Sequence, residues 1–168
     1  MVPLISRRNL PLLLLRAREE ALSNFRPVIS HFGLTEQQWR ILRTLAEQGE
    51  IEPCQIADLC KILPPSLAGV LARMEEAGLV RRRRHESDLR RVLVAATDRG
   101  HRIVEDAAPL IERQYELLEQ ALGPDVIAGL YRALDAYLDA SRIPVPPVDL
   151  PATDVPVDHR KGRRRGEG

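Results

Sequence analysis

The amino-acid sequence predicts a mainly α-helical fold that carries one small β-hairpin. Apolar residues recur at intervals of three and four along most of residues 10–140, which is the spacing of amphipathic helices. Residues 80–96 depart from that spacing, because the runs VRRRR and RRVLVAA flank a short polar segment as two strands flank a turn. The length of 168 residues fits one domain, or one domain with an appended element.

Three helices are expected in the first part of the chain. A long amphipathic helix covers residues 10–32, and Pro27 inside it should bend it or weaken one turn. A second helix begins after Thr35, because Thr35 followed three residues later by Gln38 is a capping-box arrangement. A short third helix begins at Pro53, since the first helical position is where the missing N–H of proline costs least.

A fourth helix is expected in PPSLAGVLARMEE, ending at Gly78. Its apolar face follows the i, i+3, i+4, i+7 pattern and consists of Leu67, Val70, Leu71 and Met74. The two strands of the hairpin follow at residues 80–84 and 90–96, and the β-branched and small residues of VLVAA can lie against a core.

Two helices and a tail are expected after the hairpin. The fifth helix runs from Thr97-Asp98 to about Leu122, with a kink at Pro109. A sixth helix continues to about residue 140. Residues 141–168 are rich in proline, poor in large apolar side chains and basic near the end, so we expect them to be disordered.

Positive charge is concentrated in one stretch. Six arginines lie within RRRRHESDLRRVLV, residues 81–94, although the net charge of the whole chain is only +1. The charge therefore forms a local patch, which favours a polyanion such as nucleic acid as the partner. A solvated face without a partner and a module that binds any polyanion are the alternatives.

No segment predicts a membrane span or a secretion signal. The apolar run LPLLLL is too short, lacks a small-residue cleavage site and continues into charged residues. No stretch approaches the roughly eighteen apolar residues of a spanning helix. Cys54 and Cys60 match no usual zinc spacing and are too few for a disulfide framework, so a reducing cytoplasm is the expected location.

The sequence does not predict an enzyme. It contains neither a glycine-rich phosphate loop nor a nucleophile elbow. The histidines are scattered without the spacing of metal ligands, at His31, His85, His101 and His159. We therefore expect no catalytic residue, no metal and no cofactor.

The order of the elements predicts a winged helix-turn-helix. The third and fourth helices are joined by a turn of three or four residues, and a basic hairpin follows. In this arrangement the fourth helix enters the major groove of DNA, arginines of the hairpin contact phosphates, and one arginine at its tip can enter a narrow minor groove. The DNA-binding domain would cover residues 33–97, between helical regions at residues 8–32 and 98–140.

The hairpin also carries a family resemblance. DLRRVLVAATDRG, residues 88–100, resembles the Asp-x-Arg-x-x-x-Val-x-x-Thr pattern of MarR-family transcription regulators, and RMEEAGLVRR resembles their junction between recognition helix and wing. AREEALSNFRPV and LTEQQWRILRTL resemble the family's repressors of homoprotocatechuate and hydroxyphenylacetate degradation operons. The resemblance covers roughly residues 8–140. The pair Ala95-Ala96 departs from it, because the family often has a polar residue and then leucine there, and the tail is additional.

The resemblance implies a homodimeric repressor of an aromatic-acid catabolic operon. The helical regions 8–32 and 98–140 would form the dimerisation platform, although periodicity alone is equally consistent with an internal core. Two recognition helices about 34 Å apart would require a palindromic operator, of which one chain reads half. A MarR-like regulator that senses oxidants through Cys54 or Cys60 is the alternative.

The resemblance further implies release by a phenolic or arylacetic acid, bound between the first helix and the DNA-binding part. Such a site needs an apolar wall for the ring and a cation or hydroxyl for the carboxylate. The candidates are Arg18, Ser23, Arg26, Trp39 and Arg40. The alternatives are that Trp39 belongs to the core and that Arg40 faces solvent.

The expected DNA contacts lie on the fourth helix and on the hairpin. The outward positions of the helix are Pro65, Ser66, Ala68, Gly69 and Arg73. Only Ser66 and Arg73 carry useful donors, so base recognition would be partly apolar, through thymine methyls. An alternative for Arg73 is a phosphate clamp or an ion pair with Glu75 or Glu76.

Alternate residues of a strand face opposite sides, so only about half of the arginines at 81–84 should face phosphates. The expected contacts of the hairpin are Arg82, Arg84, His85, Asp88, Arg90 and Arg91. In the family, Arg90 matches the arginine of the wing tip, and Asp88 matches the acid that helps to orient it.

Overall fold

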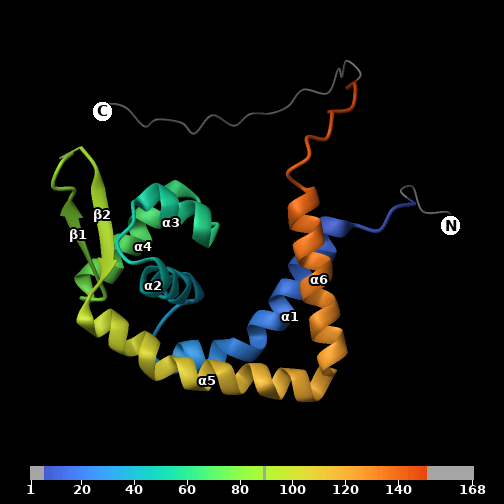
Figure 1. Ribbon diagram of the computed structural model, residues 1–168, viewed down its shortest axis with the longest axis horizontal. Helices are drawn as coiled ribbons and strands as arrows, with labels where there is room; N and C mark the ends of the chain where they lie inside the picture. Colours follow the sequence, from blue (N-terminus) through green and yellow to red (C-terminus); the bar gives the residue numbers. More distant parts are fainter. Residues whose placement is uncertain (1–5, 89, 151–168) are drawn as a thin grey trace, which may run out of the picture. The chain divides into compact units, whose positions relative to one another are not determined.

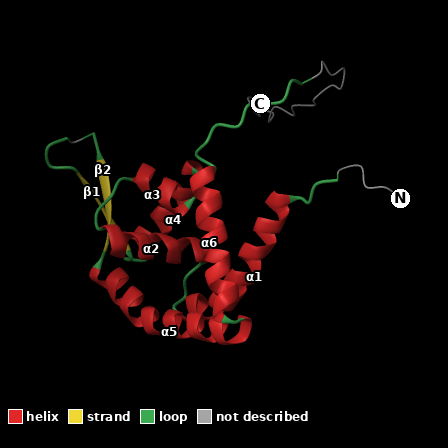
Figure 2. Ribbon diagram, turned by 45° about the vertical axis from the view of Figure 1, so that its right-hand side comes forward, coloured by secondary structure: helices red, strands yellow, loops and turns green. Residues whose placement is uncertain are grey.

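The computed structural model describes residues 6–88 and 90–150. Within these residues it contains six helices and one antiparallel two-stranded sheet, which confirms the predicted fold class (Figures 1 and 2). The elements are α1 (Leu10–His31), α2 (Glu36–Gln48), α3 (Pro53–Cys60), α4 (Pro64–Glu76), β1 (Val80–Arg84), β2 (Val92–Ala96), α5 (Asp98–Leu122) and α6 (Pro124–Ala140). The chain divides after Ile127 into two compact units.

The ends of the helices follow the expected local chemistry. The capping box of α2 is complete, because the Gln38 N–H donates to the Thr35 hydroxyl at 3.3 Å and the Thr35 N–H donates to the Gln38 side chain at 2.8 Å. α1 and α5 both continue through their internal prolines, Pro27 and Pro109. Figure 1 shows α5 as a curved helix, so the expected kink is spread over its length.

One hydrophobic core holds α2, α3, α4, the base of the hairpin and the nearer parts of α1 and α5 together. The largest side chains that are fully buried are Ile41, Leu42, Leu45, Ile56, Leu71, Met74, Val80 and Val94. All four predicted apolar positions of α4 are buried. Among the described residues no single helix is long and apolar enough to cross a membrane. The bent pair α3 and α4 reaches the length and composition of a membrane-spanning segment only when the two helices are counted together.

α3 and α4 form the helix-turn-helix pair. Their axes differ in direction by 109° across the three-residue turn that begins at Lys61. Lys61 adopts a left-handed conformation with φ of 50°, and the Ile62 N–H closes the turn by donating to the Ala57 carbonyl at 3.1 Å. An angle near 90–120° is typical of this motif and leaves the outer face of the second helix free.

The hairpin extends beyond α2, α3 and α4 in both views (Figures 1 and 2). β1 and β2 pair from Val80 opposite Ala96 to Arg84 opposite Val92. The expectation that the second strand begins at Arg90 is wrong, because the Asp88 carboxylate accepts from the Arg90 N–H at 3.1 Å and the Asp88 carbonyl accepts from the Arg91 N–H at 2.9 Å. These bonds form a turn, so the strand begins two residues later.

Large apolar side chains of the flanking helices are exposed, with 41% to 59% of their surface accessible. In the first unit these are Leu10, Leu12, Leu13 and Leu15 of α1, Leu110, Leu117 and Leu122 of α5, and Val126 of α6. In the second unit they are Leu130, Tyr131, Tyr137 and Leu138 of α6. An internal core therefore does not account for these faces within the described chain. Residues 144–150 form no helix or strand, and the rest of the predicted tail lies outside the described residues.

Candidate nucleic-acid interface

The outward face of α4 is assembled as expected. Pro65, Ser66, Ala68 and Arg73 are exposed and Gly69 is half-buried, on the side of the helix away from the core. Leu63 was not among the expected contacts; it precedes the helix and is 75% exposed. Its place beside the first turn of α4 adds an apolar group to a face on which Ser66 is the only hydroxyl.

Arg73 is available for an external partner. In the described parts of the chain it makes no ion pair, and the alternative of a pair with Glu75 or Glu76 is not formed. A Cβ atom placed on Gly69 would lie 3.6 Å from Nη1 of Arg73, so the guanidinium lies back along the outward face of α4. It is therefore positioned beside the residues expected to meet DNA.

The six arginines of the hairpin have different partners. Arg81 and Arg83 both bind Glu50, in the loop between α2 and α3. Arg82 binds Glu75 at 3.3 Å, at the end of α4. Arg91 binds Glu52. Within residues 6–88 and 90–150, Arg84 and Arg90 form no ion pair with a carboxylate, and both are exposed.

The tip of the hairpin is organised by hydrogen bonds between residues close together in the sequence. Asp88 accepts from the main-chain N–H of Arg90, so it fixes the backbone of the turn and not the guanidinium. His85 Nδ1 lies 3.0 Å from the Ser87 hydroxyl and accepts from the Ser87 N–H at 3.3 Å. The Arg90 side chain is thus exposed on a fixed turn, where it can reach a groove.

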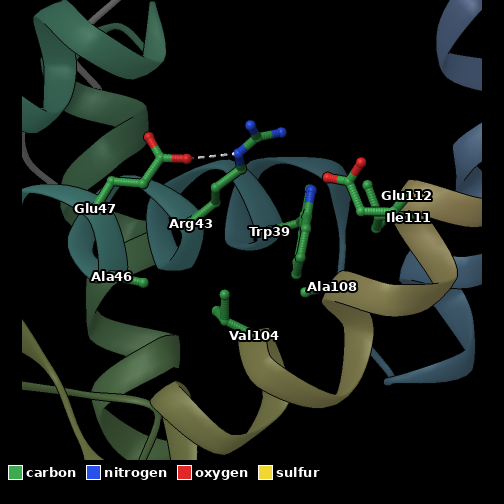
Figure 3. Close-up of a pocket in the computed structure, with 8 residues that line it drawn as sticks. All are labelled: Trp39, Arg43, Ala46, Glu47, Val104, Ala108, Ile111 and Glu112. Atoms are coloured by element: carbon green, nitrogen blue, oxygen red, sulfur yellow. Dashed lines mark hydrogen bonds and ion pairs between the residues drawn. The ribbon is translucent and has the colours of Figure 1, made fainter. Parts of the chain in front are cut away.

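A hollow of about 180 Å³ lies between α2 and α5 (Figure 3). Trp39 and Arg43 project from α2, and Val104, Ala108, Ile111 and Glu112 face them from α5 (Figure 3). The Arg43 Nε donates to Glu47 at 2.8 Å. Hydrogen bonding to Glu47 raises the pKa of Arg43, burial opposes the rise, and a hydrogen bond with Tyr115 adds to it. The Tyr115 ring in turn packs against Phe25, with ring centroids 4.6 Å apart.

The five expected effector residues are not brought together. Arg18 and Arg40 line a second hollow of about 270 Å³ between α1 and α2, whereas Trp39 lines the first. Ser23 donates to its own helix at the Glu20 carbonyl, 2.7 Å away, and Arg26 pairs with Glu19; neither lines either hollow.

Arg40 does not simply face solvent, as one alternative had it. Its Nη1 donates to the Cys60 carbonyl at 2.8 Å and its side chain is 34% exposed. Glu36 lies 3.4 Å from Arg40 and also binds Arg18, so one carboxylate is shared by the two guanidiniums of the α1–α2 hollow. Burial lowers the pKa of Arg40, and the nearby charge of Arg18 lowers it further.

The sequence pattern contained signals for the residues that were missed. Arg43 follows Trp39 by four positions, which places both on one helix face. Glu50 and Glu52 flank Ile51, and alternate residues of an extended segment point to the same side. Tyr115 comes from a distant helix, and only the tertiary structure brings it near Arg43.

Comparison with known proteins identifies the family. The MarR family model matches residues 34–92. The HTH-type transcriptional regulator FarR of Neisseria gonorrhoeae is 38% identical over 130 residues, which cover 73% of this chain and 89% of FarR. The chain belongs to the MarR family of transcription regulators. The homoprotocatechuate degradative operon repressor of Escherichia coli is also 38% identical over 130 residues, 77% of this chain and 88% of that repressor.

Solved structures of transcription regulators share the fold. The transcriptional regulator PA4135 has a TM-score of 0.75 and 41% identity, over 83% of this chain and all of that one. NadR in complex with 4-hydroxyphenylacetate has a TM-score of 0.69 and 34% identity, over 82% and 97% of the two chains. The repressor CouR, bound to a 23-mer DNA duplex, has a TM-score of 0.70 and 28% identity, over 77% and 92%.

Proposed function

We propose that this MarR-family chain is a homodimeric, sequence-specific repressor of an aromatic-acid catabolic operon, released from a palindromic operator by a phenolic or arylacetic acid. The observation that carries the proposal is the exposed face of α4 beside a hairpin whose Arg84 and Arg90 are not neutralised by any described carboxylate. α4 would read base edges in the major groove, and Arg90 would enter the adjacent minor groove. The structure of the repressor CouR bound to a 23-mer DNA duplex supports DNA as the partner.

The exposed apolar faces support a homodimer. A monomer rarely leaves so many large apolar side chains in water, and a face on each flanking helix is what a second copy would cover. A two-fold axis between copies repeats the recognition helix, which explains why the operator would be a palindrome with half-sites about 34 Å apart. Residues 8–32 and 98–140 are the proposed dimerisation region, and residues 33–97 the DNA-binding domain.

The α2–α5 hollow is the better candidate for the effector. Its volume of about 180 Å³ lies below the roughly 300–1,000 Å³ of sites for drug-sized ligands, which suits a molecule with a single ring. The Trp39 indole supplies an apolar wall, and the Arg43 guanidinium supplies a cation for a carboxylate. The α1–α2 hollow is the weaker candidate because Trp39 does not line it and Glu36 binds both of its arginines, whereas Glu47 binds the single arginine of the α2–α5 hollow. The 4-hydroxyphenylacetate complex of NadR supports the ligand class.

DNA recognition is tested by replacing Arg90 with alanine. We expect operator affinity, measured by mobility shift on the DNA upstream of the chain's own gene, to fall by about 1–3 kcal/mol while the circular-dichroism melting curve stays unchanged. Arg142→Ala is the matched control, because it removes the same charge from an exposed arginine outside the hairpin. An Arg90→Ala protein that stays folded and binds as tightly as the parent would show that the wing assignment is wrong.

The effector site is tested by intrinsic fluorescence, because Trp39 is the only tryptophan of the chain and lines the hollow. Titration with 4-hydroxyphenylacetate and related phenolic acids should change the emission and release operator DNA. Arg43→Gln should abolish both responses, and Arg18→Gln should leave them unchanged. If Arg18→Gln abolishes both responses and Arg43→Gln leaves them unchanged, the effector is assigned to the α1–α2 hollow. If the parent responds to no aromatic acid, the proposed effector class is contradicted.

A further inference from the structure

Two carboxylates are fixed beside the hairpin by the loop between α2 and α3. Ile51 pairs with Val94 of β2 through two main-chain hydrogen bonds, Ile51 N–H to Val94 carbonyl at 3.1 Å and Val94 N–H to Ile51 carbonyl at 2.9 Å. The loop is therefore held against β2 by this single bridge. Glu50 and Glu52 flank Ile51, and their side chains are only 26% and 24% exposed.

Glu50 holds two arginines at once. It accepts from Nε of Arg83 at 2.8 Å and from Nη2 of Arg81 at 3.4 Å. Arg81 and Arg83 are two positions apart in β1, so they share one side of the strand, and that side faces Glu50. Hydrogen bonding to Arg83 is the main cause that lowers the pKa of Glu50, and Arg81 adds to it, so the carboxylate is charged at neutral pH.

The other ion pairs complete a pattern. Glu52 binds Arg91, and Glu75 of α4 binds Arg82. The exposed Glu86 also lies 3.7 Å from Arg83, so four carboxylates engage four of the six hairpin arginines, and Glu50 is the one that holds two. An arginine that reaches a DNA phosphate releases a condensed counterion, and each such contact adds about 0.9 to the slope of log affinity against log salt whatever the base sequence. Six free arginines would therefore favour binding to any DNA.

We propose that Glu50 is a positioning residue that holds Arg81 and Arg83 away from DNA phosphates and thereby limits non-specific binding. The inference rests on the proposed function, because it assigns specificity to the same DNA-binding surface. Glu50 neutralises part of the charge of the hairpin and fixes both guanidiniums on the side of the α2–α3 loop. Phosphate contacts of the hairpin are left mainly to Arg84 and Arg90, and base recognition to α4.

The first test replaces Glu50 by glutamine, which keeps the shape and removes the charge. Binding to a labelled duplex of scrambled sequence is measured by fluorescence anisotropy between 50 and 200 mM salt. Release of one or two arginines should steepen the salt slope by about 0.9–1.8, so that the loss of affinity over this fourfold range of salt is about 3.5- to 12-fold larger than for the parent. Glu76→Gln is the matched control, because Glu76 is an exposed acid of α4 that makes no ion pair within the described residues. It should leave the slope unchanged.

The second test does not depend on the folding of the Glu50→Gln protein. Replacing both Arg81 and Arg83 by alanine in the parent should leave the slope on scrambled DNA nearly unchanged, because neither arginine contacts phosphate there. The same double replacement in the Glu50→Gln background should restore the slope of the parent. The proposal is overturned by a folded Glu50→Gln protein with the slope of the parent, or by a parental double replacement that lowers the slope by about 1.8.

The operator measurement separates this inference from the proposed function. With DNA from upstream of the chain's own gene, Glu50→Gln should raise affinity for scrambled DNA more than affinity for the operator, so the ratio of the two falls at least threefold. If the parent binds both duplexes equally, the proposed repressor function fails, and the inference fails with it. If the parent is specific and Glu50→Gln leaves the ratio unchanged, only the role of Glu50 is wrong.

Discussion

The winged helix-turn-helix and the helices that flank it differ in how they use the same apolar periodicity. In α2, α4 and the base of the hairpin, residues such as Leu42, Leu71 and Val94 are almost completely buried within the single chain. In the outer part of α1, residues such as Leu10 and Leu13 recur with similar spacing and remain 45% and 41% exposed. The DNA-binding part therefore has a complete core, whereas the flanking helices present apolar faces that still need a cover.

This difference shows what an amphipathic pattern does and does not specify. The pattern indicates that a helix has an apolar face. Burying that face lowers the free energy of the folded protein. It does not tell whether the cover comes from the same chain or from a second copy. In this chain the exposure of the faces supplies that information, and it favours the second copy that the proposed function requires.

The largest expected effect comes from placing a charge in the open face. Leu13→Glu would bury an unpaired carboxylate in each copy of a dimer, at about 3–5 kcal/mol per copy, so we expect a monomer by analytical ultracentrifugation and the loss of operator binding. Leu59→Glu is the matched control, since Leu59 of α3 is 56% exposed and lies outside the flanking helices. If Leu13→Glu remains dimeric, or if Leu59→Glu also dissociates, the open face of α1 is not the interface.

A somewhat smaller effect is expected when a side chain of the closed core is truncated. Leu42→Ala should lower the free energy of unfolding by about 2–5 kcal/mol, because a buried leucine leaves a cavity. In urea titrations, the loss of unfolding free energy in Leu42→Ala should be the same at every protein concentration, once the dissociation of the dimer is taken into account. In Leu13→Ala, the loss of unfolding free energy should become larger as the protein is diluted. Equal concentration dependence of the two variants would contradict the distinction between a closed core and an open face.

Much of the fold could be predicted from the sequence because its signals are local. Thr35 and Gln38 complete the capping box, Pro53 and Pro64 begin the helix-turn-helix pair, and the four apolar residues of α4 all enter the core. The predicted start of the second strand was wrong because the N–H groups of Arg90 and Arg91 both donate to Asp88 and form a turn there. A local pattern thus predicts helices well and turns less well.

The candidate site could be predicted only in part because its contacts join distant residues. The outward face of α4 follows from helical spacing, and the structure bears out its geometry. The partition of the hairpin arginines does not follow, since Glu50 comes from the α2–α3 loop about thirty residues before β1, whereas Glu75 lies just before β1 at the end of α4. The hollow beside Trp39 likewise requires α5, some seventy residues away, to form its second wall.

The smallest effects are expected at the two cysteines, which lie on either side of the boundary between core and surface. Cys60 is 2% exposed and its Sγ lies 3.4 Å from the Thr44 hydroxyl, while Cys54 is exposed with Glu52 as its polar neighbour, 3.7 Å away. Redox-active cysteines favour electropositive, partly exposed surroundings, and neither site offers both. Cys54→Ser combined with Cys60→Ala should therefore leave operator affinity and the response to phenolic acids within about twofold of the parent, at a loss of about 1 kcal/mol in stability from Cys60.

Treatment of the parent with peroxide supplies the complementary measurement. If peroxide releases the operator from the parent but not from the double variant, the oxidant-sensing alternative is correct, and the aromatic acid is not the signal.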